Sequence, residues 1–493
     1  MKHTTPQRGR MLMASLLLLG TLGTLPAAAQ DDATTQNGAS AYGGAYITGP
    51  ASNPLSFLNG PAYRTTGQGT PYDFPDFAPI TALDNQLPAW IGFGLEERFR
   101  AEGMENQSFK RNDDDNYLLN RWRFLMQIKA TSWLRIVGQM QDARAWLQQP
   151  PLQPPNTNRF DLKLAYAEVG DPEHQWISVR VGRQLINYNN TIIANSEWRD
   201  QARSYDAVVT NLHYERYHLG LFAASAVVPM DEGISHHQEG NNIYGAYGQI
   251  DNVVPMSSLE PFVLWRVQPS VSVETASKAT TGHENEQAYG VRFKGLAFGN
   301  FDYSFEGIRE GGTDGSNDIR AWGTTDGLAY RFSEMYWKPR IFTQYDYASG
   351  DKNAHDQVHG TFDTMYPTAH DRFGISDQFG WQNIRAVRGG ITIEPHRRWT
   401  VTGQWLDFWL ASATDSLYNT SGGSIVRNLT GSAGTHIGQE ADAYTWYELN
   451  RHVNVGVGFA HIFPGQYLTL MEKGPNFSYP YFALNFKDAG KTH

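Results

Sequence analysis

Basic side chains at every second position point to anion binding. Arg121, Arg123 and Lys129 fall on one face of an extended chain, whereas Trp122 and Phe124 fall on the other. Guanidinium and ammonium groups bind carboxylates and phosphates, and around a water-filled passage they concentrate anions. The chemistry expected of these residues is therefore the binding and passage of an anion.

The elements that position these bases are expected to be long β-strands. The same alternation occurs in the segments 92–101, 289–294 and 301–306, and several segments alternate over about nine to eleven residues, the span of a tilted strand across a bilayer. The residues expected on the lipid-facing side are Phe93, Leu95, Trp122, Phe124, Val291 and Phe293. A soluble β-sandwich would show the same alternation, with the aromatic face in its core.

Composition fits a transmembrane barrel, but taken alone it supports a secreted soluble β-sandwich or propeller about equally well. Aromatic residues make up 13% of the chain, yet charged residues reach 18% and mean hydropathy is -0.49. A transmembrane barrel combines these properties because its aromatic outer face alternates with a wet interior. The chain has no cysteine, so disulfides do not stabilise it. Together with the length of the alternating segments, these properties lead us to expect an all-β fold, a single transmembrane antiparallel β-barrel.

The N-terminus has the pattern of a secretory signal peptide. Lys2, Arg8 and Arg10 precede the apolar stretch 11–25, and the small residues 27–29 suit cleavage. The expected organisation is a signal peptide over 1–29, a Gly-, Pro- and Ser-rich periplasmic leader over 30–88, the barrel over 89–487, and a disordered tail over 488–493. This organisation predicts a location in the bacterial outer membrane, in contact with lipid and away from nucleic acid.

No motif in the sequence indicates catalysis or a bound cofactor. There is no G-x-S-x-G elbow, no H-E-x-x-H and no phosphate-binding loop. The pair His236-His237 lies in a polar stretch and is interpreted as a loop, not a metal site. The acidic run Asn112–Asn116 lacks the glycine and distal glutamate of an EF-type calcium loop. We expect neither a metal nor enzymatic activity, although a triad gathered from distant strands would leave no sequence signature.

Several short motifs, in order, resemble the alginate-export family of outer-membrane barrels, and the likeness covers roughly residues 90–486. The motifs are Val179–Gln184, Glu197–Asp200, Arg203–Asp206, Tyr347–Asp351, Phe362-Asp363 with Tyr366-Pro367, His370–Gly374, Trp381–Asn383 and Gly438–Asp442. The resemblance implies a monomeric barrel of about eighteen strands with an electropositive lumen that passes a polyuronate. A periplasmic export scaffold is a further partner in keeping with it.

The resemblance also assigns roles to particular residues. It places lumen bases at Arg98, Arg123 and Lys163 and an acidic gate residue at Asp200. The sequence departs from the family where Leu185 replaces a second arginine and where the stretch 453–459 lacks two alternating arginines. The basic constriction is thus only partly kept, which weakens the inference to polysaccharide export.

The expected pore-lining residues combine both lines of argument. They are Arg98, Arg123, Lys129, Lys163, Arg180, Arg183, Asp200 and Arg292. For each base the alternative is pairing with an acid on the next strand, which would only hold the barrel in shape. The face of Arg183 depends on Gly182, because a bulge there would shift the strand by one residue.

Four functions fit these expectations. The first is a channel for an anionic polysaccharide or acidic oligosaccharide, and the second is a general porin for small acidic solutes. An outer-membrane hydrolase and a plugged structural or adhesive barrel are the third and fourth. The sequence leaves the substrate, the direction of transport and the gating open.

Overall fold

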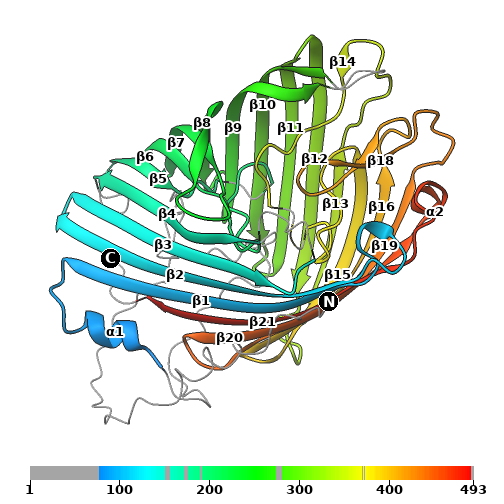
Figure 1. The fold of residues 1–493 in the computed structure, drawn as a ribbon. Coiled ribbons are helices and arrows are strands. Elements are labelled where there is room, and N and C mark those ends of the chain that lie inside the picture. The colour runs from blue at the N-terminus through cyan, green and yellow to red at the C-terminus, as the bar shows by residue number, and fades with distance from the viewer. Residues whose placement is uncertain are drawn as a thin grey trace, which may run out of the picture. The chain divides into compact units, whose positions relative to one another are not determined.

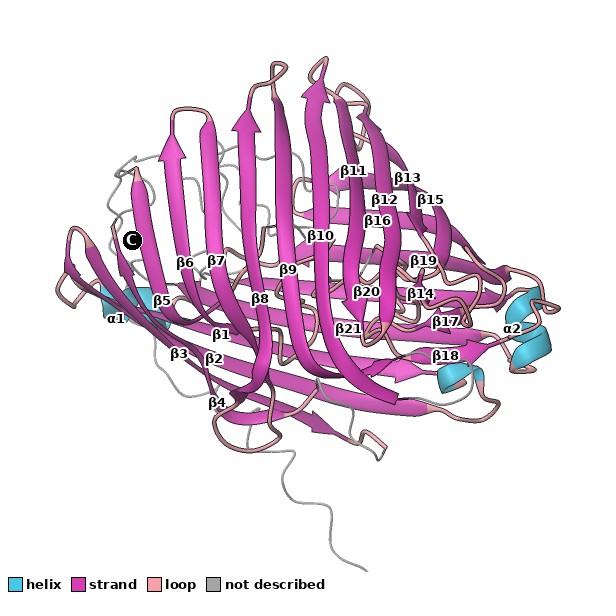
Figure 2. Ribbon diagram, turned by 90° about the horizontal axis from the view of Figure 1, so that it is seen from above, coloured by secondary structure: helices cyan, strands magenta, loops and turns pink. Residues whose placement is uncertain are grey.

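The computed structural model describes residues 77–149, 156–170, 176–188, 191–273, 280–368, 370 and 372–489, all within the compact unit Gly38–His493. Eighteen strands form a closed antiparallel barrel, which confirms the predicted fold (Figures 1 and 2). The barrel strands are β1 Ile91–Met104, β2 Asp115–Thr131, β3 Leu134–Trp146, β4 Asn158–Val169, β5 Ile177–Gln184, β6 Tyr205–Tyr214, β7 Tyr217–Val228, β8 His236–Asp251, β9 Ser257–Val273, β10 Thr280–Ala297, β11 Phe301–Asp314, β12 Asn317–Arg331, β13 Arg340–Ala348, β15 Ile384–His396, β16 Trp399–Leu410, β19 His436–Glu448, β20 Val453–Pro464 and β21 Phe477–Ala489.

Closure of the barrel comes from pairing between the first and last strands. Strand β1 runs antiparallel to β21 from Gly94 opposite Ala489 to Glu102 opposite Tyr481, and the blue and red strands lie side by side in Figure 1. Each remaining strand pairs with the next barrel strand along the chain. The barrel therefore has no unpaired edge, which is what a sheet in a bilayer requires.

The two faces of the wall divide as the sequence predicts. Trp122, Phe124 and Val291 are 42%, 44% and 47% exposed on the outside, whereas the neighbouring Arg121 and Arg123 are buried inside. Packing the aromatic face into a core would reverse this pattern, so the sandwich alternative is excluded. Among the described residues, no helix is long and apolar enough to cross a membrane.

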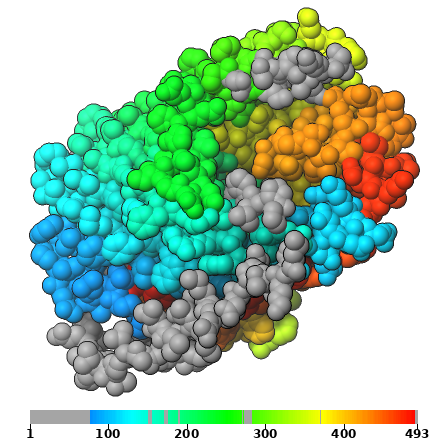
Figure 3. Space-filling model, viewed as in Figure 1, coloured from blue at the N-terminus to red at the C-terminus, as the bar shows by residue number. Residues whose placement is uncertain are grey.

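The two ends of the barrel differ in their connections. Short turns join the strands at one end, here called the turn end, while the other, the loop end, carries the long segments 185–204, 349–383 and 411–435. These three segments contribute Ile193, Phe362 and Leu417 to one buried apolar cluster. The smaller elements are the 3-10 turn Gln107–Phe109, β14 Val358–His359, β17 Ser416–Tyr418, β18 Ser424–Arg427 and helix α2 Gln466–Met471. In Figure 3, α2 (red) lies against the orange residues of the β16–β19 region.

A short helix, α1 (Pro79–Asp84), is fixed to the turn end by the last strand. The carboxylate of Asp488 accepts hydrogen bonds from the backbone N–H of Ile80 (2.7 Å) and the hydroxyl of Thr81 (2.6 Å). Strand β21 continues to Ala489, two residues beyond the predicted end of the barrel, because Asp488 and Ala489 still pair with Leu95 and Gly94 of β1. The predicted signal peptide, most of the predicted leader and residues 490–493 lie outside the described residues.

Candidate functional site

The segment 185–204, here called the inner loop, connects β5 to β6 and folds into the barrel. Ile186, Ile192 and Ile193 are fully buried within the central apolar cluster. Strands β5 and β6 have only 8 and 10 residues, so the chain leaves the wall early on both sides of the loop. Burial of three isoleucines favours the inward course, at about 1.5 to 3 kcal/mol for each side chain.

Beneath the inner loop, the wall presents five bases, here called the basic patch. They come from three strands: Arg98 and Arg100 from β1, Arg121 and Arg123 from β2, and Lys163 from β4. None of them is more than 7% exposed. Two acids of the wall, Glu96 and Glu102, lie among them and pair with Arg121 and Arg100. The wall alone is therefore electropositive at this level.

The acids of the inner loop meet the basic patch directly. Asp200 lies 2.6 Å from Arg98 and 3.2 Å from Arg100 through one carboxylate oxygen. Glu197 lies 2.8 Å from Arg123 and 3.4 Å from Arg121. The loop thereby supplies two anionic ligands to a wall built to receive anions.

Backbone carbonyls of the loop complete the contacts. Lys163 donates to the carbonyl oxygens of Gln201 (2.8 Å) and Ala202 (2.9 Å). Arg98 donates to those of Glu197 (2.7 Å) and Trp198 (2.9 Å). A carbonyl carries only a partial charge, so these contacts orient the bases without neutralising them.

The local field keeps both loop acids ionised. The low-dielectric interior opposes the charge on Glu197, but Arg123 and Arg121 outweigh that effect and lower its pKa to about 2. Burial likewise opposes the charge on Asp200, and Arg98 and Arg100 hold its pKa below the ordinary value. The Glu197 side chain is 44% exposed, whereas that of Asp200 is 1% exposed. Glu197 is thus the contact that solvent and solutes reach.

Trp198 ties the inner loop to the segment 349–383. Its ring stacks on His370 with 3.9 Å between centroids, and the guanidinium of Arg100 lies 4.3 Å from the ring centroid on the wall side. Arg203 reaches the same segment by donating to the carbonyl oxygen of Pro367 (3.3 Å). Movement of the inner loop would therefore disturb its neighbour as well.

The remaining predicted pore-lining bases lie outside this assembly. Arg180 is fully buried and pairs with Glu168 at 3.1 Å, and Arg292 pairs with Glu260 at 2.9 Å. These two match the alternative of ion pairs that hold the wall in shape. Lys129 is half-buried near the turn end of β2, away from the basic patch.

The placement of Arg183 corrects one prediction. Arg183 lies three residues after the inward Arg180 in a strand of period two, so it shares the outer face with Val181, which is 50% exposed. It binds both oxygens of Asp206, at 2.8 and 3.0 Å. Gly182 has a φ of 121°, yet the pairing with β4 continues without a shift. Arg183 therefore does not line the lumen.

The set of expected pore-lining residues omits three members of the assembly, Arg100, Arg121 and Glu197, although Arg121 is placed on the basic face of its strand. Arg100 and Arg121 lie two residues from Arg98 and Arg123 in the same strands, so the alternation of the sequence already places them on the same face. Glu197 has no such signal, because its partners lie about 75 residues away and the loop has no period.

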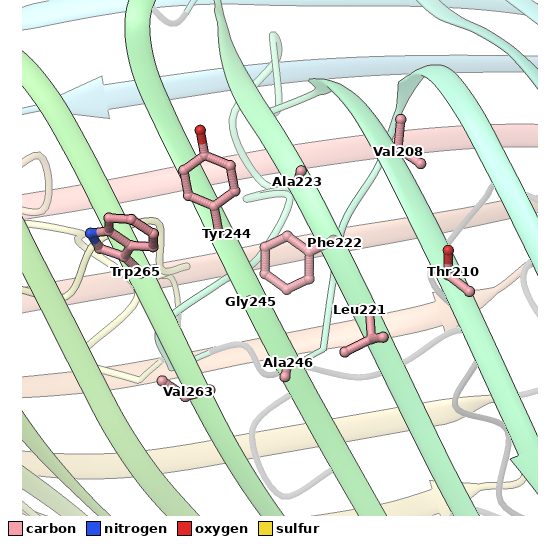
Figure 4. A pocket seen from close by; sticks show the side chains of 10 residues that line it. All are labelled: Val208, Thr210, Leu221, Phe222, Ala223, Tyr244, Gly245, Ala246, Val263 and Trp265. Carbon is pink, nitrogen blue, oxygen red and sulfur yellow. The ribbon is translucent and has the colours of Figure 1, made fainter.

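A separate hollow lies on the outside of the barrel, over β6 to β9 (Figure 4). Its volume is about 450 Å³, and its walls include Val208, Leu221, Tyr244 and Trp265. It has no charged lining residue, and its aromatic and aliphatic walls suit lipid chains better than a solute. The lumen is therefore the candidate site.

Comparisons with known proteins agree with a channel fold. The family described as alginate export matches residues 89–474. No curated protein matches the chain. Among solved structures, Pseudomonas aeruginosa OpdQ is 8% identical, with a TM-score of 0.54 over 81% of this chain and 98% of that one. Acinetobacter baumannii OccAB4 is 9% identical, with a TM-score of 0.53 over 80% and 98%. These distant likenesses concern the fold.

Proposed function

Because the chain belongs to the alginate-export family and forms a channel of the bacterial outer membrane, we propose that it passes an anionic saccharide chain across that membrane. The family and the barrel indicate a channel rather than an enzyme. The observation that carries the proposal is the contact of Glu197 and Asp200 with four arginines of the basic patch. The protein acts as a monomer in this proposal.

Glu197 and Asp200 of the inner loop compete with the carboxylates of the substrate for the arginines of the basic patch. A uronate unit carries a carboxylate like those of Glu197 and Asp200, so it is able to take the place of either one against an arginine. Bidentate binding of a carboxylate by guanidinium is directional and stronger than a neutral hydrogen bond. Exchange would begin at Glu197, which is exposed, and proceed toward the buried Asp200. Repeated exchange along a polyanion would move it past the patch without leaving any arginine unpaired.

The second candidate is a porin for small acidic solutes. It is favoured by Leu185, a buried apolar residue where the family has a second arginine, and by the stretch 453–459, which has no arginine. A single basic patch suffices to concentrate small anions, whereas a long polyanionic chain is bound more tightly by several basic patches in series.

Conductance in planar bilayers tests both candidates. Purified protein should give discrete, anion-selective currents, and Arg123→Glu should lower or reverse that selectivity. Arg320→Glu, whose side chain is 63% exposed near the loop end, is the matched control and should leave selectivity unchanged. Cation-selective wild-type currents would refute the proposal.

Chain length separates the two candidates. Oligouronates of increasing length should block the current with rising affinity if the channel binds a chain. Equal block by monomer and oligomer, with steady passage of small acids, would instead establish the porin.

A further inference from the structure

Arginines and aromatic rings alternate along the outside of the barrel near the loop end. Arg309 of β11 stands directly opposite Trp322 of β12. Arg385 of β15 stands directly opposite Tyr347 of β13 on one side and Trp409 of β16 on the other. The rings of Trp322 and Tyr347 stack with 4.3 Å between centroids and so join the two groups. This row, here called the outer band, consists of Arg309, Trp322, Tyr347, Arg385, Trp409 and, beside Trp409, His436 of β19.

The outer band faces away from the lumen. Because side chains alternate along a strand, Arg309 shares a face with Phe305, which is 43% exposed. In the same way Arg385 shares a face with Val387, which is 46% exposed. The long connections of an outer-membrane barrel are extracellular, so the loop end and the band lie at the outer leaflet. Tryptophan and tyrosine side chains on such a face mark the level of the lipid headgroups.

The two arginines of the outer band have no acidic partner. Neither Arg309 nor Arg385 forms an ion pair with any residue that the structure describes, and Nε of Arg385 is buried without a hydrogen-bond partner. A guanidinium group at the membrane surface that binds no carboxylate is available to another anion.

The three acids on the outer faces of β12 and β16 are engaged elsewhere. Asp407 pairs with His436 at 2.8 Å, and Asp318 pairs with Arg320 at 3.1 Å. Asp326 lies farther toward the turn end, where it accepts a hydrogen bond from a threonine hydroxyl at 3.1 Å. The positive charge of Arg309 and Arg385 is therefore not cancelled within the wall.

We propose that the outer band binds the phosphate groups of an anionic lipid of the outer leaflet. Guanidinium binds phosphate through two parallel hydrogen bonds, and it also stacks on aromatic rings such as those beside Arg385. Toward the turn end the same faces present large apolar or aromatic side chains that are 41–46% exposed, namely Phe305, Tyr345, Val387 and Trp405. Acyl chains lie on these side chains while the phosphates contact the arginines.

Both parts of this surface match a phosphorylated lipid, whereas a free anion would use the arginines alone. Because the band lies outside the lumen, this inference goes beyond the proposed function and stands without it.

Binding of purified lipid A tests the inference. Native mass spectrometry of the barrel in a neutral detergent should show binding of bis-phosphorylated lipid A, and removal of both phosphates should weaken it at least tenfold. The double variant Arg309→Gln, Arg385→Gln should weaken binding of the phosphorylated form to a similar degree. Arg216→Gln is the matched control, because Arg216 lies 5.1 Å from the Tyr217 ring at the turn end, and it should bind like wild type.

Three results would overturn the inference. Equal binding of the phosphorylated and dephosphorylated forms would mean that apolar contact alone holds the lipid. Unchanged binding in the double variant would exclude the two arginines, and displacement of the lipid by an equimolar amount of inorganic phosphate would indicate a site for free anions. If the double variant fails to fold, judged by heat-modifiable migration on gels, Arg309→Gln alone takes its place under the same criteria.

Discussion

Arg98 and Arg121 stand directly opposite each other on the lumen face of β1 and β2. Like charges in this position repel, and a strand pair alone would be destabilised by them. The inner loop relieves the repulsion, because Asp200 pairs with Arg98 and Glu197 with Arg121. The wall and the loop are therefore stable together at this level, and changes to either should alter both folding and conduction.

Asp200→Asn should destabilise the barrel. The substitution leaves Arg98 and Arg100 without their shared carboxylate in a buried place, and breaking a buried pair from one side costs about 3 to 5 kcal/mol. We expect loss of heat-resistant migration at a lower temperature than in wild type. Asp318→Asn, at an exposed ion pair near the loop end, is the control. Equal behaviour of the two variants would mean that the Asp200 contacts contribute little.

Glu197→Gln should increase anion selectivity and destabilise the barrel less than Asp200→Asn does. The side chain is 44% exposed, so its loss leaves the fold intact while one negative charge leaves the basic patch. A unit charge about 4 Å away is worth roughly 1 to 4 kcal/mol in these surroundings. Reversal potentials in a salt gradient measure the change. Glu232→Gln, in an exposed ion pair with Arg159, should not alter the reversal potential. An equal shift of the reversal potential in this variant would contradict the placement of Glu197 in the conduction path.

The pH dependence follows from Glu197. Its folded pKa of about 2 lies below the ordinary value of 4.5, so its contribution to stability is present above pH 4.5 and is lost only as pH falls through about 2. Between pH 7 and pH 4.5 the difference in selectivity between wild type and Glu197→Gln should therefore stay constant. A difference that disappears near pH 5 would show that Arg121 and Arg123 do not act on this carboxylate.

Asn383→Ala should loosen the inward segments at the loop end. Asn383 is fully buried, accepts the backbone N–H of Ser412 (2.6 Å) and donates to the carbonyl oxygens of Ser412 and Ser416. Each buried group left unpaired costs about 1 to 3 kcal/mol. Limited proteolysis should cut the segment 411–435 faster than in wild type, while Ser421→Ala, at an exposed site, should not change the rate.

Cysteine labelling checks the facing of the strands, since the chain has no native cysteine. Phe124→Cys and Val291→Cys point outward from the wall and should resist a bulky water-soluble maleimide in intact membranes. Leu429→Cys, on the loop end and 64% exposed, should react readily. Free reaction at Val291 would place it in water and refute the predicted facing.

The sequence predicted the wall well because its information is local. A strand of period two assigns Phe93 and Trp122 to one face and Arg98 and Arg123 to the other, whatever their distant partners. Even the error at Arg183 is local, since counting three residues from Arg180 gives its face correctly.

The interior was not predictable in the same way. Asp200 was named only by resemblance, and its partners Arg98 and Arg100 are about 100 residues distant. Arg266 and Asp363, which are hydrogen-bonded to each other in the lumen, are 97 residues apart in the sequence. Loop segments have no regular alternation of apolar and polar residues from which such contacts could be predicted, so only a three-dimensional structure reveals them.

The pairing of the first strand with the last strand has a consequence for assembly. Strand β21 pairs with β1, and Asp488 binds the start of α1. The first strand therefore has no partner on one side until the residues near position 488 have been synthesised. Until then a nascent chain exposes two open edges, each able to pair with another molecule. Closure of the barrel therefore requires the last strand, and removal of that strand should yield aggregates instead of a smaller pore.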